Sequence, residues 1–127
     1  LSQPELLQIQ VNAMATITDL ASKQCKPCEG GVRAPALSQD EASTLLLQLD
    51  GWALQDSRIG KAFEFKDHYQ TMAFVNAVAW ISHSANHHPD MSVGYRRCRL
   101  EYSTHAVNGL SENDFICAAK VDALFKI

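Results

Sequence analysis

The chain has 127 residues, of which 46% are hydrophobic, and its formal net charge is −3. This length and apolar content fit one compact domain and are too small for two ordinary ones. A net negative charge argues against direct binding of nucleic acid, because a phosphate backbone is bound through a basic surface. There is neither an apolar run of about 20 residues that could span a bilayer nor a recognisable secretory signal. We therefore expect a cytoplasmic protein with no membrane contact.

Residues 1–36 differ in composition from the rest and are expected to form a partly flexible N-terminal extension. Their last third, CKPCEGGVRAPA, is rich in the Gly and Pro that favour loops. Cys25 and Cys28 have the spacing of half a zinc site or of a redox pair, but no second pair stands at ligand spacing. With Cys98 and Cys117 they are too few and too unevenly spaced for a disulfide framework, so we expect reduced thiols.

The compact domain is expected over residues 37–127 and begins with a predicted helix over residues 39–49. Ser38 and Glu41 form a capping box, and the apolar stripe of ASTLLLQL follows. Asp50-Gly51 then breaks the helix. WALQ and IGKAFEF are short β-prone runs on either side of a turn, and they predict a β-hairpin.

A long helix is predicted from Asp67, at a second capping position, to about His87. Pro89 disfavours the helical conformation at His88, so the chain should become extended there. At 100° per residue an apolar face lies nearly opposite a polar strip that contains Asn76, His83 and His87. The flanks of the helix are also apolar, which indicates burial against the sheet and against a second subunit.

The last part of the chain predicts two strands and a helix. MSVGY and CRLEYS read as strands, Asn108-Gly109 forms a turn, and Ser111 and Asp114 stand at capping positions before FICAAKVDALFKI. The order is therefore helix, hairpin, helix, two strands, helix. This order predicts an α+β domain in which helices cover one face of a small antiparallel sheet.

Four of the five histidines lie in two neighbouring segments: His83, His87, His88 and His105. An imidazole gives and takes protons near neutral pH, so the cluster suggests acid/base catalysis. A metal site is an alternative, because His83 and His87 have i, i+4 spacing and His105 or Asp114 could complete it, although the glutamate of an HExxH motif is missing. Simple helix-end histidines, favoured by the helix dipole, are the third interpretation.

An ordered set of motifs resembles the pterin-4a-carbinolamine dehydratases, also described as dimerization cofactors of a homeodomain transcription factor. The set consists of His87-His88-Pro89, Tyr95, Ser103-Thr104-His105 and GLSENDF, and similarity extends from about residue 37 to residue 123. The resemblance implies a four-stranded antiparallel sheet with three helices on one face, in the order α-β-β-α-β-β-α. It also implies a homodimer or homotetramer.

The resemblance implies dehydration of 4a-hydroxytetrahydrobiopterin to quinonoid dihydrobiopterin, with the pterin as substrate and without a metal or other cofactor. This reaction recycles the pterin of aromatic amino acid hydroxylases, typically phenylalanine hydroxylase. By position, His87 and His105 would be the acid/base pair and Asp114 would support a histidine. The implied pterin-binding residues are His83, His88, Ser103 and Thr104.

His83 occupies a position where many members of this family carry glutamate, and the helical angle predicts that it faces the site. Two other functions stay open. One is a protein-binding role as a dimerization cofactor or transcriptional coactivator, and the other is a pterin activity linked to molybdopterin metabolism.

Overall fold

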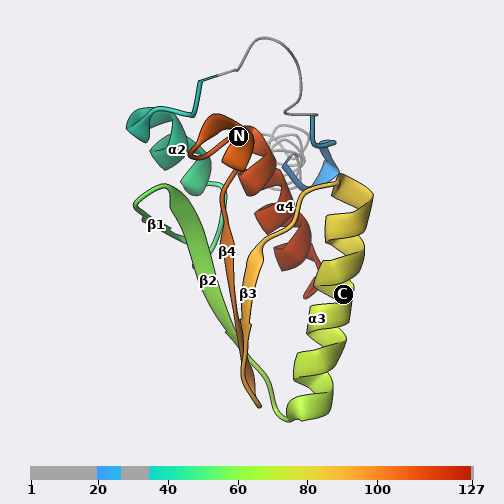
Figure 1. Cartoon of the computed structure of the whole chain (residues 1–127). Coiled ribbons are helices and arrows are strands. Elements are labelled where there is room, and N and C mark those ends of the chain that lie inside the picture. The colour runs from blue at the N-terminus through green and yellow to red at the C-terminus, as the bar shows by residue number, and fades with distance from the viewer. Residues whose placement is uncertain (1–19, 27–34, 127) are drawn as a thin grey trace, which may run out of the picture.

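The computed structural model describes residues 20–26 and 35–126. Its centre is a four-stranded antiparallel sheet, as the family resemblance implies, and the strand order in the sheet is β1-β2-β4-β3 (Figure 1). The strands are β1 (Ala53–Gln55), β2 (Arg58–Glu64), β3 (Asp90–Val93) and β4 (Arg97–Tyr102). The α+β class and the order of strands and main helices are thus confirmed.

Three helices connect and cover these strands: α2 (Gln39–Leu46), α3 (His68–Ala85) and α4 (Glu112–Ala123). A short 3-10 helix, η1 (His105–Val107), follows β4. The predicted capping box of α2 is present, since the Ser38 Oγ accepts from the Glu41 amide at 3.1 Å and the Glu41 carboxylate accepts from the Ser38 amide at 2.9 Å. The helix ends at Leu46 rather than near residue 49.

The expected number of three helices is too low. Residues 20–22 are also α-helical, so the described part of the chain contains four α-helical segments. Leu20 is only 2% exposed and belongs to the hydrophobic core. The weak amphipathic pattern before the Gly- and Pro-rich stretch does not predict this helix, because its burial depends on contacts with the distant α4.

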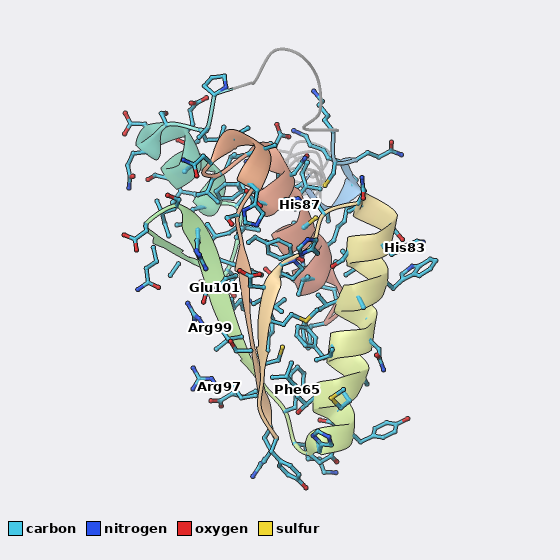
Figure 2. The ribbon with its side chains drawn as sticks, in the orientation of Figure 1. Phe65, His83, His87, Arg97, Arg99 and Glu101 are labelled. Carbon is cyan, nitrogen blue, oxygen red and sulfur yellow. The ribbon has the colours of Figure 1, made fainter. Side chains whose placement is uncertain are left out.

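One face of the sheet forms the core, and the other faces away from the helices. Along β4 the side chains of Cys98, Leu100 and Tyr102 are fully buried. The alternate residues Arg97, Arg99 and Glu101 extend from the opposite side of the sheet, away from α3 (Figure 2). This alternation is the two-residue period of a strand with one covered face.

The long helix ends at Ala85, two positions before the predicted end. Asn86 takes a left-handed conformation (φ 52°, ψ 41°), and its amide bonds to the carbonyls of His83 and Ser82. An αL residue after the last turn is a common way to stop a helix, and asparagine tolerates it. The direction of the chain therefore changes before His87. None of the described helices is both long and apolar enough to cross a bilayer.

Candidate active site

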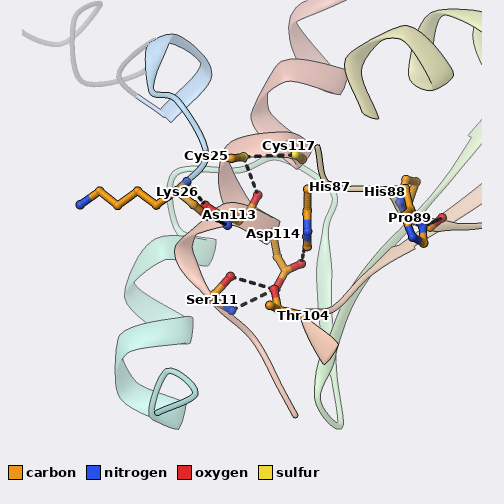
Figure 3. A network of polar contacts seen from close by, with 10 residues as sticks. All are labelled: Cys25, Lys26, His87, His88, Pro89, Thr104, Ser111, Asn113, Asp114 and Cys117. Carbon is orange, nitrogen blue, oxygen red and sulfur yellow. Dashed lines mark hydrogen bonds and ion pairs between the residues drawn. The ribbon is translucent and has the colours of Figure 1, made fainter. Parts of the chain in front are cut away.

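The centre of the site is a hydrogen bond between His87 and the carboxylate of Asp114. The His87 Nε2 lies 2.6 Å from Asp114 Oδ1, and Asp114 is fully buried (Figure 3). The imidazole also stacks on the buried ring of Tyr102, with ring centroids 5.9 Å apart. Packing on one side and a hydrogen bond on the other hold the ring in one orientation, which a proton-transfer group needs.

The Asp114 carboxylate is held by two further donors. Its Oδ2 accepts from the Thr104 hydroxyl at 2.8 Å and from the Ser111 amide at 3.0 Å. Asp114 stands in the first turn of α4, while Thr104 follows the end of β4. Because its partners are donors, the carboxylate accepts at both oxygens, and Nε2 of His87 must carry a proton to complete the set. Nδ1 is then the ring nitrogen left for a ligand.

The pKa of His87 lies above its ordinary value. Burial of the ring acts in the opposite direction, but the hydrogen bond and the negative charge of Asp114, with a smaller contribution from Cys25, outweigh it. A buried carboxylate that stabilises an adjacent imidazolium is a familiar arrangement in acid/base catalysis. The carboxylate of Asp114 therefore favours the protonated form of His87.

The imidazole of His87 lines a cavity of about 510 Å³ that is large enough for a small heterocyclic ligand. The predicted residues His88, Ser103, Thr104 and His105 line the same cavity. His88 and His105 are exposed, and Ser103 is half-buried. These four predicted residues and His87 thus lie at one cavity.

His83 lies outside the cavity, and the hydroxyl group of Thr104 is engaged inside the protein. His83 is exposed and points away from the domain, and its ring contacts Trp80 at 5.7 Å between centroids (Figure 2). It does not line the cavity, because the αL residue Asn86 ends the helix and separates the directions of His83 and His87. Thr104 is buried, and its hydroxyl bonds to Asp114 and to the Ser111 hydroxyl, so it supports the carboxylate.

Cys25, Lys26 and Asn113 also line the cavity and are among the lining residues that the sequence does not predict. Asn113 accepts from the Lys26 amide at 2.9 Å and donates to the Lys26 carbonyl at 2.7 Å. These two bonds attach residues 20–26 to the start of α4. The CKPC motif was the one available signal, but nothing local in the sequence indicates that it reaches the histidines.

Metal binding is one of the two alternative interpretations of the histidines. Within residues 20–26 and 35–126, no group of three or more His, Cys, Asp or Glu side chains is arranged to hold a metal ion. The i, i+4 pair expected from His83 and His87 does not form, since His87 lies beyond the end of α3. The structure places three imidazoles, those of His87, His88 and His105, at one cavity, and the buried carboxylate of Asp114 lies against His87.

The chain is a small α+β domain with a histidine-lined cavity, and comparison with known proteins gives its family. The chain belongs to the family described as pterin 4 alpha carbinolamine dehydratase, whose model matches residues 35–124. The resemblance inferred from the histidine motifs is thereby confirmed.

Curated relatives agree with this family. A protein of Nitrosospira multiformis named "Putative pterin-4-alpha-carbinolamine dehydratase" is 65% identical over 112 residues, which are 88% of this chain and 97% of that protein. A Nitrosomonas europaea protein of the same name is 63% identical over 114 residues, 89% of this chain and 99% of the relative.

A solved structure is also similar. It is described as a transcriptional coactivator/pterin dehydratase from Brucella melitensis and has 31% sequence identity and a TM-score of 0.68. The match covers 70% of this chain and 97% of the other.

Proposed function

We propose that this protein catalyses dehydration of 4a-hydroxytetrahydrobiopterin to quinonoid dihydrobiopterin by histidine acid/base catalysis. The observation that carries the proposal is the His87–Asp114 hydrogen bond at the wall of a cavity that His88 and His105 also line. Family membership supplies the substrate class. No metal or other cofactor enters the proposed reaction.

The reaction needs one proton delivered to the departing 4a-hydroxyl group and one proton removed from the pterin ring. His87 suits the first task, because Asp114 raises the pKa of the His87 imidazole. The Nε2 atom of His87 is hydrogen-bonded to Asp114, so Nδ1 is the atom that can donate to the substrate. His105 lines the same cavity from the start of η1 and is the proposed base. Each positioned proton transfer typically contributes about 10²- to 10⁴-fold to the rate.

The remaining cavity residues are proposed to bind the pterin. His88 leaves the helix end on an extended chain, so it approaches the cavity from a different direction than His87, and Ser103 adds a hydroxyl group. The hydroxyl of Thr104 is committed to Asp114, which makes it a positioning group. The product would return to an aromatic amino acid hydroxylase, such as phenylalanine hydroxylase, after reduction.

The test is a direct assay with chemically generated 4a-hydroxytetrahydrobiopterin, in which the absorbance of the quinonoid product is followed with and without a chelator. We expect dehydration well above the spontaneous rate and equal rates in both samples. A rate no faster than the spontaneous reaction would refute the proposed activity. A rate that the chelator abolishes would refute the metal-free mechanism.

A protein-binding role is the second candidate, because the similar Brucella melitensis structure is described as a coactivator as well as a dehydratase. The outer surface of α3 exposes large side chains, with Tyr69 83% and Trp80 69% exposed. Exposed aromatic residues of this kind favour contact with another protein surface.

Assembly into a homodimer or homotetramer stays a prediction. The link to molybdopterin metabolism stays a prediction as well.

A further inference from the structure

Two cysteines far apart in the sequence meet beside the active site. The Sγ atoms of Cys25 and Cys117 lie 3.6 Å apart, although 92 positions separate them (Figure 3). Cys25 belongs to the segment 20–26, and Cys117 lies on α4, three positions after Asp114. Both are free thiols in this structure. A contact this close needs only a small displacement to reach the S–S bond length of about 2.05 Å.

The two thiols differ in their access to small molecules. Cys25 is half-buried and lines both the cavity of the histidines and a neighbouring cavity of about 470 Å³. Cys117 is fully buried and lines neither of them. A small oxidant that enters either cavity therefore meets Cys25 first, and Cys117 lies directly behind it.

The surroundings favour a thiolate at Cys25. The hydrogen bond with Cys117 lowers the pKa of Cys25, and the charges of His87 and Lys120 add to this effect against the opposing effect of burial. The pKa of Cys117 is raised by the same hydrogen bond and by burial. With Cys25 as the thiolate, Cys117 would be the donor in the contact between the two sulfur atoms. An accessible thiolate beside a second thiol is the usual arrangement of an oxidisable cysteine.

We propose that Cys25 and Cys117 form a redox-active pair that hydrogen peroxide converts to a disulfide. The Cys25 thiolate attacks one peroxide oxygen, the O–O bond breaks, and the sulfur becomes a sulfenic acid while the other oxygen leaves as water after taking a proton. The Cys117 thiol then attacks the sulfenic sulfur, so that the S–S bond forms, the S–O bond breaks and a second water leaves. Two thiols and one hydrogen peroxide give one disulfide and two waters.

This disulfide would link the segment 20–26 covalently to α4. In the reduced protein this segment is attached through Lys26 and Asn113, and both residues line the cavity of the histidines. Oxidation would fix one wall of that cavity, and a dithiol reductant would release it by thiol–disulfide exchange. The proposal does not depend on the pterin reaction, because it concerns only the thiols.

The test treats the full chain with hydrogen peroxide, alkylates the remaining thiols in denaturant and maps the peptides by mass spectrometry. We expect a Cys25–Cys117 disulfide that dithiothreitol removes. It should persist in Cys28→Ser and Cys98→Ser and be lost in Cys25→Ser and in Cys117→Ala. A Cys25–Cys28 disulfide in its place, or oxidation with no disulfide at Cys117, would overturn the proposal.

Thermal unfolding gives a second measurement that needs no activity. A disulfide that closes so long a loop restricts the unfolded chain, so peroxide should raise the Tm of the wild-type protein and of Cys28→Ser. Peroxide should not raise the Tm of Cys25→Ser. Cys25 is half-buried, which makes it the milder of the two positions to substitute. An equal rise in Cys25→Ser would contradict the assignment of the pair.

Discussion

Replacement of His87 by alanine should lower kcat for dehydration by about 10²- to 10⁴-fold, which is the usual contribution of a positioned acid/base group. The reason is that Nδ1 of His87 is the proposed proton donor, while Asp114 holds the ring and raises its pKa. Stopped-flow measurement with chemically generated 4a-hydroxytetrahydrobiopterin gives the rate. The matched control is His83→Ala, which removes an exposed imidazole from the same region of the chain without touching the cavity.

His83→Ala should retain the wild-type rate. An equal loss of rate in His83→Ala and His87→Ala would contradict the proposed role of His87.

His87→Ala should also change how the free energy of unfolding depends on pH. The folded pKa of His87 is raised, so the stabilisation by its protonated ring is complete below the ordinary pKa of 6.5 and is lost as the pH rises through the folded value. The stability gap between wild type and variant should therefore be larger at low pH than at high pH.

Asp114→Asn is expected to have the second large effect. Both oxygens of the carboxylate accept hydrogen bonds, and the amide replaces one of them with an NH₂ group. At least one of the donors Thr104, Ser111 and His87 therefore loses its acceptor. The free energy of unfolding should fall by about 1–3 kcal/mol, the cost of an unsatisfied buried polar group. The activity should fall by about 10²- to 10⁴-fold, because the imidazole loses its orienting partner.

NMR titration of His87 separates this positioning role from general damage to the fold. Without the charge of Asp114, burial is left as the larger influence, and the pKa of His87 should move below its ordinary value. Glu112→Gln is the control, because Glu112 is a carboxylate on the same helix that pairs with Lys23 and not with His87. The side chain of Glu112 is 44% exposed. An unchanged pKa of His87 in Asp114→Asn would show that the carboxylate does not act on the imidazole.

Local patterns predict the sheet and the three main helices. The alternation along β4 places Cys98, Leu100 and Tyr102 in the core, and the capping box of Ser38 and Glu41 begins α2 as expected. These features depend on neighbours one to four positions apart, which is the range that periodicity and capping describe.

Local sequence patterns do not predict features that depend on the backbone conformation of one residue or on a long-range contact. His83 was expected at the site because helical geometry was extended to His87, but the αL conformation of Asn86 ends the helix between them. The hydrogen bond from the Thr104 hydroxyl to Asp114 is likewise a tertiary contact that no local pattern predicts. Cys25 and Cys117 are 92 positions apart in the sequence, so no local sequence pattern predicts their contact.

The central claim is that two imidazoles at one cavity transfer the protons of dehydration. The pH dependence of kcat/KM, measured for wild type, His87→Ala and His105→Ala after subtraction of the spontaneous rate, tests it most directly, because this parameter reports the acid and base of the free enzyme. We predict a bell-shaped profile for wild type, loss of the alkaline limb in His87→Ala and loss of the acidic limb in His105→Ala. Profiles that keep both limbs in both variants would contradict the account.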